Sequence, residues 1–178
     1  MDRVFYGRVR VQKATCFLFF HEKGIVRNLI HYLKYRNQRQ IGDFLGRWYG
    51  EILAADKALP ALDMAIPVPL HPKKLKIRGY NQVSGFSGEI ARRLCIPHRE
   101  DLLLKSTHTQ TQTRKSRLFR WEQQPPAFRV TNYSDLRGKK VLLMDDVITT
   151  GATLEACVKA LKRAGEIEVY IATMAVVP

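Results

Sequence analysis

The chain has 178 residues, 46% of them hydrophobic, which suits one globular domain with a sizeable core and leaves little room for a second. The 30 Lys and Arg residues against 16 Asp and Glu give a formal net charge of +14 at pH 7, so the surface should attract polyanions, either phosphorylated metabolites or nucleic acid. The absence of a membrane-length apolar run and of a signal-peptide pattern after Met1 predicts a soluble, cytoplasmic protein with no membrane partner.

The first third of the chain is predicted to be mainly helical. Residues 23–35 and 40–59 carry apolar side chains at helical spacing, and Pro60 interrupts the second pattern. A short strand over residues 16–20 precedes the first helix. The two apolar faces consist of Ile25, Leu29, Ile30 and Leu33, and of Ile41, Leu45, Trp48, Tyr49 and Ile52.

The middle of the chain predicts a strand, helix, strand unit of a parallel sheet. "LDMAIPVPLHP" reads as a short buried strand that ends in a proline-rich loop, because proline cannot donate to a ladder. A helix over residues 81–94 follows, with Val83, Phe86, Ile90 and Leu94 facing inward, and "DLLLKS" is the second strand.

The remainder contains a long polar segment and then a second alternation of strand and helix. Residues 106–126 are rich in Thr, Gln and Arg, and their length favours a functional loop over a plain connector. "KKVLLMDD" is typical of a parallel strand that is buried on both faces. A helix over residues 153–164, ended by Gly165, and the strand "IEVYIATMAVV" complete the pattern.

The motif "VLLMDDVITTGAT", residues 141–153, carries the most chemical information. A buried strand brings Asp145 and Asp146 to its carboxyl end, the edge at which open parallel sheets bind ligands. The small turn that follows can approach a phosphate closely, and its hydroxyls add donors to the free amides of a helix start. The two carboxylates suit the vicinal hydroxyls of a ribose. The alternative is structural: an acid pair that ends a strand and a turn that caps a helix. The predicted phosphate-binding residues are Thr149, Thr150, Gly151, Ala152 and Thr153.

"DDVITTGAT" resembles the motif with which type I phosphoribosyltransferases bind 5-phosphoribosyl-1-pyrophosphate (PRPP). "HYLKYRN", "IPVPLHPKKLKIRGYNQ" and "TQTRKSRLFR", in this order ahead of it, resemble the ComF family of phosphoribosyltransferase-like proteins. The resemblance implies an α/β fold with a mostly parallel central sheet flanked by helices. It implies a single domain over residues 1–178, with a helical hood over about 1–60 and a PRPP-binding core over about 61–178.

The resemblance also implies roles for individual residues. Asp145 and Asp146 would hold the ribose and position Mg²⁺, directly or through water, and would act in catalysis with Arg114. A non-proline cis peptide is expected at Leu70–His71. For any single basic residue of these loops, the alternative is a solvated surface charge that contacts no ligand. The implied pyrophosphate contacts are Leu70, His71, Lys73 and Arg78 after the first core strand, and Arg114, Lys115 and Arg117 in a mobile lid.

Two departures from related families limit the expectations. Members of the ComF family commonly begin with a Cys-rich zinc-binding segment, whereas Cys16, Cys95 and Cys157 form no CxxC pair, so no zinc is predicted. Hypoxanthine-guanine phosphoribosyltransferases carry a carboxylate proton acceptor three residues after the acid pair. Thr149 stands there in this chain, and a neutral hydroxyl is a poor general base near pH 7.

The predicted function is transfer of the phosphoribosyl group from PRPP, with Mg²⁺, to an unidentified small nitrogen nucleophile, releasing pyrophosphate. One alternative is a non-enzymatic role in competence, because ComF-like proteins are associated with DNA uptake. The clusters "KYRNQR", "HPKKLKIR" and "RKSRLFR" could then contact single-stranded DNA, or the chain could bind a competence protein. A PRPP sensor on the same fold is a further alternative. The fold often forms homodimers, so a homodimer is one alternative for the oligomeric state of this chain.

Overall fold

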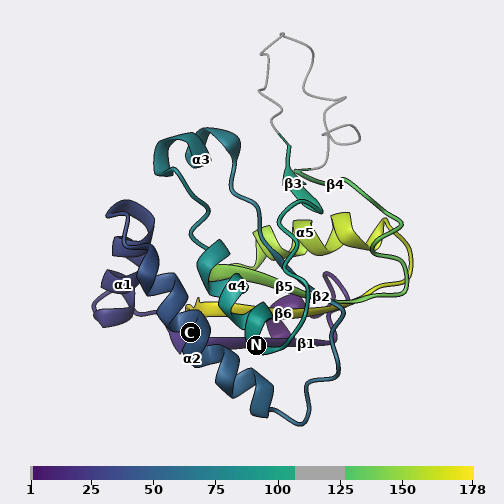
Figure 1. Cartoon of the computed structure of the whole chain (residues 1–178), viewed down its shortest axis with the longest axis horizontal. Helices are drawn as coiled ribbons and strands as arrows, with labels where there is room; N and C mark the ends of the chain where they lie inside the picture. The colour runs from purple at the N-terminus through teal and green to yellow at the C-terminus, as the bar shows by residue number, and fades with distance from the viewer. Residues whose placement is uncertain (1, 107–126) are drawn as a thin grey trace, which may run out of the picture.

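The structure is a computed structural model that describes residues 2–106 and 127–178. Its elements alternate between strands and helices after a mainly helical first third, as Figure 1 shows. In chain order they are η1 (Asp2–Phe5), β1 (Lys13–Phe19), α1 (Ile25–Tyr35), α2 (Arg39–Ala55), β2 (Met64–Pro67), α3 (Pro72–Arg78), α4 (Ser84–Arg93), β3 (Leu103–Lys105), β4 (Phe128–Val130), β5 (Lys140–Ile148), α5 (Ala152–Lys162) and β6 (Glu168–Val176).

Four parallel strands form the central sheet in the order β1-β6-β5-β2. Strand β5 lies between β2 and β6, with Met64 opposite Val141 on one side and Val169 opposite Val141 on the other. The first third of the chain supplies β1, which pairs with β6 at the edge of the sheet. All four strands end at the same edge, where loops to α3 and α5 begin.

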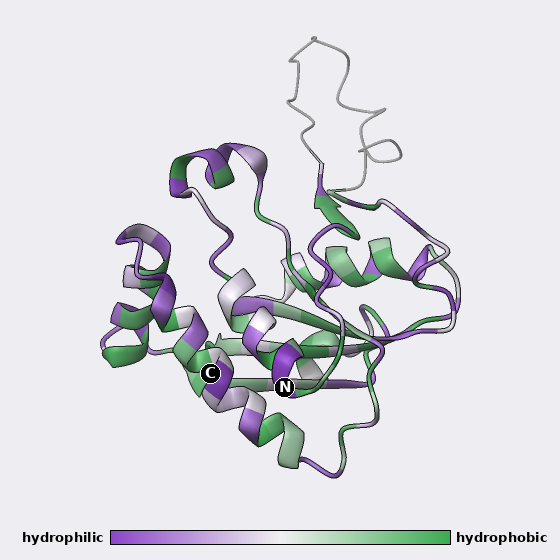
Figure 2. Cartoon of the chain, in the orientation of Figure 1, coloured by the Kyte–Doolittle hydropathy of each residue, from purple (hydrophilic) through white to green (hydrophobic). Residues whose placement is uncertain are grey.

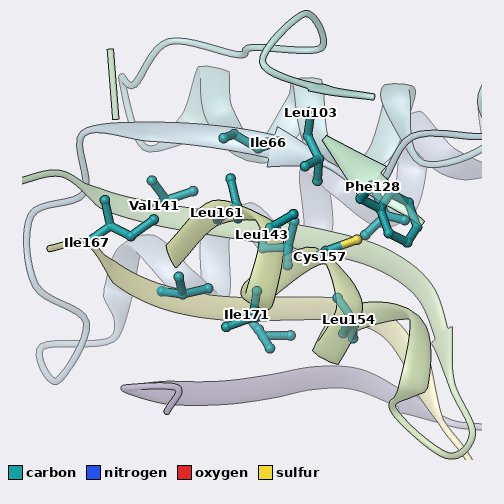
Figure 3. Close-up of a cluster of buried hydrophobic side chains, with 14 of the residues drawn as sticks. Ile66, Leu103, Phe128, Val141, Leu143, Leu154, Cys157, Leu161, Ile167 and Ile171 are labelled. Atoms are coloured by element: carbon teal, nitrogen blue, oxygen red, sulfur yellow. The ribbon is translucent and has the colours of Figure 1, made fainter. Parts of the chain in front are cut away.

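Both faces of the sheet are buried, which explains why its strands are almost continuously apolar. Successive side chains of β5 alternate between two clusters: Leu143 packs with the α5 side, and Leu142 with the side of α2 and α4. Figure 3 shows the first cluster, where Leu154 and Leu161 of α5 lie against Leu143 and Ile171 of the sheet. In Figure 2 the strands are mostly hydrophobic, whereas α3 projects away from the sheet and is largely hydrophilic.

Helix α2 confirms the predicted second helix but differs in its end and its inward face. It stops at Ala55 instead of Leu59, and Trp48 and Ile52 are 55% and 47% exposed. Leu45 and Tyr49 are buried as predicted, and Gly42, Gly46 and Gly50 share the buried face with them. A β-carbon at Gly46 would lie 2.5 Å from the backbone oxygen of Phe86 in α4. The glycines therefore allow a close helix crossing, and the large side chains beside them turn outward.

The strand predicted within "DLLLKS" is present as β3, but its predicted place in the parallel sheet is wrong. β3 pairs antiparallel with β4 in a separate two-stranded sheet. A few residues before β3, His98 forms an isolated parallel bridge with Ala65 of β2. Because Pro67 and Pro69 have no N–H to donate, the β2 edge cannot extend this pairing further.

The segment after β2 contains a helix that the sequence analysis did not predict. Helix α3 begins at Pro72, the favoured first helical position for proline, and His71 caps it by accepting a hydrogen bond from Lys73 N at 3.2 Å. Gly79 ends it with a φ of 75°. These capping signals are visible in the sequence. The predicted cis peptide at Leu70–His71 is wrong, because every peptide bond among the described residues is trans.

The helix predicted over residues 81–94 begins three residues later, at Ser84. Asn81 first forms a local turn, in which its side-chain oxygen accepts a hydrogen bond from Val83 N at 3.2 Å. Val83, Phe86 and Ile90 are buried as predicted, but Leu94 is only partly buried. The helix predicted over residues 153–164 is α5, and the last predicted strand is β6. In the described part of the chain, no helix is both long and apolar enough to span a membrane.

Candidate functional site

Asp145 and Asp146 lie near the carboxyl end of the central strand β5. They are 9% and 6% exposed, which is unusual for adjacent acids. Neighbouring side chains of a strand point to opposite faces, so the two carboxylates meet different surroundings. Asp146 contacts Lys34 and Gln82 on the side of α1 and α4, whereas Asp145 lies near Cys157 of α5 and Lys105 of β3.

Burial is the main cause that raises the pKa of Asp145 from 3.8 to about 7, and the negative charge of Asp146 is the second. Three weaker effects oppose this rise: a hydrogen bond from Asp146 N to Asp145 Oδ1 at 2.8 Å, and the positive charges of Lys34 and Lys105. The Asp145 carboxyl is therefore expected to gain or lose its proton near neutral pH. Strongly perturbed acids of this kind gather at functional sites.

Asp146 is a buried carboxylate whose charge is compensated. Its Oδ2 accepts hydrogen bonds from Lys34 Nζ and Gln82 Nε2, both at 2.8 Å, and its Oδ1 accepts one from Val147 N at 2.6 Å. Sequence reasoning missed Lys34 and Gln82. Both lie in stretches that resemble the ComF family, but no local pattern reveals that they reach the same carboxylate.

The turn between β5 and α5 has the shape expected of an anion site. Gly151 has a φ of 74°, in the left-handed region that glycine adopts readily, and a β-carbon there would lie 2.7 Å from Val4 Cγ1. Thr149, Thr150 and Thr153 are exposed around a small hollow of about 30 Å³ that Asp145 and Ala152 also line. The predicted phosphate-binding residues are thus brought together beside the acid pair.

An N-terminal arginine supports the turn from outside. Arg8 Nη1 donates a hydrogen bond to Thr150 O at 2.8 Å, and Arg8 Nη2 forms an ion pair with Glu155 of α5 at 2.7 Å. The arginine therefore ties the turn to the first turn of the helix. Sequence reasoning gave Arg8 no role, because this contact joins segments 142 residues apart.

The predicted pyrophosphate-binding residues differ from one another in their contacts. Arg78 is connected to the acid pair: its Nη1 donates to Gln82 Oε1 at 2.8 Å, and Gln82 in turn donates to Asp146. His71 serves as the cap of α3, and Lys73 is exposed on that helix. Leu70 lines the large pocket described next. Three predicted lid residues lie outside the described residues: Arg114, Lys115 and Arg117.

A second pocket, of about 650 Å³, lies close to the acid pair. Gln82, which holds Asp146, and Lys105, whose charge reaches Asp145, both line it. The pocket extends between the loop after β2, the start of α4 and strand β3. Its volume lies in the range of small-molecule sites. The acid pair is therefore linked to both pockets: Asp145 lines the small one, and Gln82, the partner of Asp146, lines the large one.

Comparison with known proteins accounts for this arrangement. The family model of the phosphoribosyl transferase domain matches residues 84–177, from α4 to the end of the last strand. The chain belongs to this family. The match includes Asp145, Asp146 and the turn after them.

Curated relatives within this family confirm the predicted resemblance to ComF. The chain is 33% identical over 147 residues to competence protein F of Haemophilus influenzae, covering 80% of this chain and 64% of the relative. It is 30% identical over 146 residues to the DNA utilization protein YhgH of Shigella flexneri, covering 80% of this chain and 63% of that relative. The chain thus spans less than two thirds of the length of these relatives.

A solved structure supports the fold alone. The glutamine PRPP amidotransferase of B. subtilis, complexed with ADP and GMP, aligns with a TM-score of 0.52 at 19% identity. The alignment covers 80% of this chain and 30% of that protein. The type I phosphoribosyltransferase fold predicted from the sequence is confirmed.

Proposed function

We propose that the chain is a PRPP- and Mg²⁺-dependent phosphoribosyltransferase that transfers the phosphoribosyl group to a small nitrogen nucleophile and releases pyrophosphate. The observation that carries this proposal is the buried pair Asp145–Asp146 at the end of β5, next to the open turn that starts α5. Membership in the phosphoribosyl transferase domain family supports the same reaction class.

Different residues of the site would bind different parts of PRPP. The exposed threonines and the backbone amides of the turn from Thr149 to Thr153 would bind the 5-phosphate, as helix starts bind anions. Asp145 and Asp146 would accept hydrogen bonds from the ribose hydroxyls and lie beneath the positive charge that develops as the anomeric bond breaks. Arg78 and Lys105, together with Arg114, Lys115 and Arg117, would face the leaving pyrophosphate.

The acid pair fits Mg²⁺ through its donor chemistry, because this ion takes oxygen ligands and usually combines one or two carboxylates with substrate phosphates and water. Lys34 already neutralises Asp146 at 2.8 Å, so a contact through water suits Asp146 better than direct coordination. Bound Mg²⁺ would offset the charge of the leaving pyrophosphate. Zinc has no part in this proposal.

A titration of PRPP with Mg²⁺ into the wild-type chain and into the Asp145→Asn/Asp146→Asn variant tests the proposal without an acceptor. Calorimetry should give saturable binding to the wild type and a loss of about a hundredfold or more in the variant, since hydrogen bonds to two charged groups are removed. Circular dichroism checks that the variant is folded. A folded wild type that does not bind PRPP would sink the proposal.

A second candidate is a DNA-handling or partner-binding role in competence, with or without PRPP sensing. The relatives named competence protein F and DNA utilization protein favour it, as does the net charge of +14. Its ligand would be single-stranded DNA or another competence protein, and a homodimer would fit either candidate. Two of the three basic clusters coincide with the proposed pyrophosphate loops, so a small polyanion already accounts for much of this charge.

A further inference from the structure

Helix α2 carries a second row of apolar side chains beside the face that packs on α4. Its members recur at helical spacing, and all of them reach solvent at least in part: Ile41, Phe44, Trp48, Ile52 and Ala55. Phe44, Trp48 and Ile52 are 54%, 55% and 47% exposed. Single apolar residues on a surface are ordinary, whereas a contiguous exposed row indicates an interaction surface.

The row continues onto the edge of the central sheet. The ring centre of Trp48 lies 5.3 Å from that of Phe17 in β1 and 5.8 Å from that of Phe44. In the described part of the chain, β1 pairs with β6 alone, so its other side is an open edge beside α2 (Figure 1). Natural edge strands are commonly protected by charges or proline, or are covered. Strand β1 has Lys13 as its one charged residue, and Phe19 near its end is 62% exposed.

These residues form one uncovered apolar surface, the α2–β1 face, which consists of Phe17, Phe19, Phe44, Trp48 and Ile52. Basic residues beside this face are paired within the chain, although the chain as a whole carries a charge of +14. Lys13 Nζ lies 2.7 Å from Asp56 Oδ2, and Arg93 Nε lies 2.7 Å from Glu51 Oε1. A polyanion therefore finds little net charge to bind here, and an apolar protein surface fits the face better.

The row on α2 is symmetric about Trp48. Phe44 and Ile52 lie four residues to either side of it, and Ile41 and Ala55 lie seven residues to either side. A second α2 that runs antiparallel, related by a twofold axis at Trp48, would place Phe44 of each copy opposite Ile52 of the other. The row is thus complementary to itself.

The charges beside the row are self-complementary in the same orientation. Arg47 and Glu51 lie on the same flank of the row, one turn of helix apart. Arg47 is exposed and forms no ion pair among residues 2–106 and 127–178. A twofold axis perpendicular to the two helices keeps this flank on one side of the pair. Arg47 of each copy would therefore lie near Glu51 of the other.

We propose that the α2–β1 face is an interface between two copies of this chain, related by a twofold axis at Trp48. Aromatic side chains form its centre, as is common in protein interfaces, and two reciprocal pairs of Arg47 with Glu51 lie at its rim. The second copy covers the apolar edge of β1 as well as the row on α2. This inference goes beyond the proposed function and does not depend on whether PRPP is bound or converted.

Sedimentation of the whole chain tests the association itself. One chain has a mass of 20.5 kDa, and the average mass should rise toward twice this value. The rise should occur over a concentration range of about 1–100 μM. Trp48→Glu introduces a charge at the centre of the interface and should weaken association about tenfold or more. The matched control, Tyr133→Glu, changes an aromatic residue that is 48% exposed outside the face, and should associate like the wild type.

Circular dichroism checks that both variants are folded. A wild-type chain that stays a monomer throughout would overturn the proposal and leave the face to a different protein. Equal association of Trp48→Glu and wild type would overturn it too, because the two copies would then meet elsewhere.

A charge exchange tests the twofold arrangement without changing the apolar centre. Arg47→Glu and Glu51→Arg each set like charges opposite one another, so each variant alone should associate about tenfold more weakly than the wild type. An equal mixture of the two variants should form heterodimers about as tight as the wild-type dimer, because every pair across the axis again has opposite signs. Arg92→Glu, which changes an exposed cation of α4, should leave association unchanged. A mixture that associates as weakly as its components would overturn the proposed orientation.

Discussion

The carboxyl group of Asp145 is held in surroundings that disfavour its charge. Burial comes first among the causes, and the adjacent Asp146 adds repulsion. Asp146, by contrast, forms an ion pair with Lys34 and accepts a hydrogen bond from Gln82. The two acids are neighbours in sequence and have similar exposure, so the difference between them arises from partners on opposite faces of β5. A site that tolerates an unfavourable charge in the free protein is consistent with a role in binding a ligand.

Asp145→Asn should reveal this penalty as a pH-dependent gain in stability. The pKa of Asp145 is about 7 in the folded chain, raised from 3.8. The stability that the folded chain gains from the protonated Asp145 carboxyl is therefore fully present below about pH 4 and is lost as pH rises toward 7. The variant cannot ionise. Its free energy of unfolding, measured by urea denaturation, should match the wild type near pH 4 and exceed it by on the order of 2–4 kcal/mol above pH 7.

Asp63→Asn provides a control of opposite sign. Hydrogen bonds from Lys140 N and Lys139 Nζ lower the pKa of Asp63. The ionised Asp63 carboxylate therefore stabilises the folded chain above about pH 4, and this stability is lost as pH falls through the lowered pKa. The variant should be less stable than the wild type at neutral pH. A flat difference between Asp145→Asn and wild type from pH 4 to 8 would contradict the buried, raised pKa.

At the scale of elements, the packing of α2 on α4 fixes the wall of the large pocket. Gly46 lets the two helices approach until its α-carbon has no room for a side chain, and Phe86 of α4 is fully buried opposite it. Asp43 and Arg39 lie one and two turns earlier on α2, and both line the pocket. A displaced α2 would therefore disturb the site as well as the core.

Gly46→Ala should destabilise the chain, whereas Gly42→Ala on the same helix should not. The new β-carbon at position 46 would lie 2.5 Å from a backbone oxygen that cannot move aside cheaply, a cost of about 1–3 kcal/mol. At position 42 the nearest atoms are 3.5 Å away, and alanine adds up to about 1 kcal/mol of helix preference. Thermal and urea unfolding of both variants measure the difference. Equal stability of the two would contradict the close helix crossing.

At the scale of the whole molecule, a charge of +14 attracts any polyanion, and the described surface concentrates part of it on α3. Lys73, Lys74 and Lys76 are exposed on this short helix, which projects from the body of the molecule in Figure 1. The same helix follows the loop that lines the large pocket. Charge of this kind increases encounter rates with anions without choosing among them.

Single-stranded DNA should therefore bind weakly and in a strongly salt-dependent way. We expect a labelled oligothymidylate to bind with a Kd no tighter than about 10⁻⁶ M at physiological salt. Changing Lys73, Lys74 and Lys76 together to Gln should reduce the slope of log affinity against log salt by about 2. Fluorescence anisotropy across a salt series measures both. Binding much tighter than this, and unaffected by PRPP with Mg²⁺, would place the DNA role ahead of the transferase.

The sequence by itself determined the strand, turn and helix around Asp145 and the positions of most other elements. These features depend on neighbouring residues: a continuous apolar run along a buried strand, glycine in a turn, and proline and glycine at helix ends. The acid pair and the threonine turn could therefore be predicted from the sequence, and the fold class followed from the resemblance of this motif to that of type I phosphoribosyltransferases. The lid residues lie outside the described residues and remain a prediction.

Only the tertiary structure decided which distant side chains complete the site. Lys34 and Gln82 reach Asp146 because α1 and α4 pack on one face of β5, and Gln82 is 64 residues from its partner. The inward face of α2 was also decided there, since hydrophobic spacing favours Trp48 and Ile52 while a close crossing requires Gly46. Sequence patterns record the environment of each element, but pairing between elements depends on packing in three dimensions.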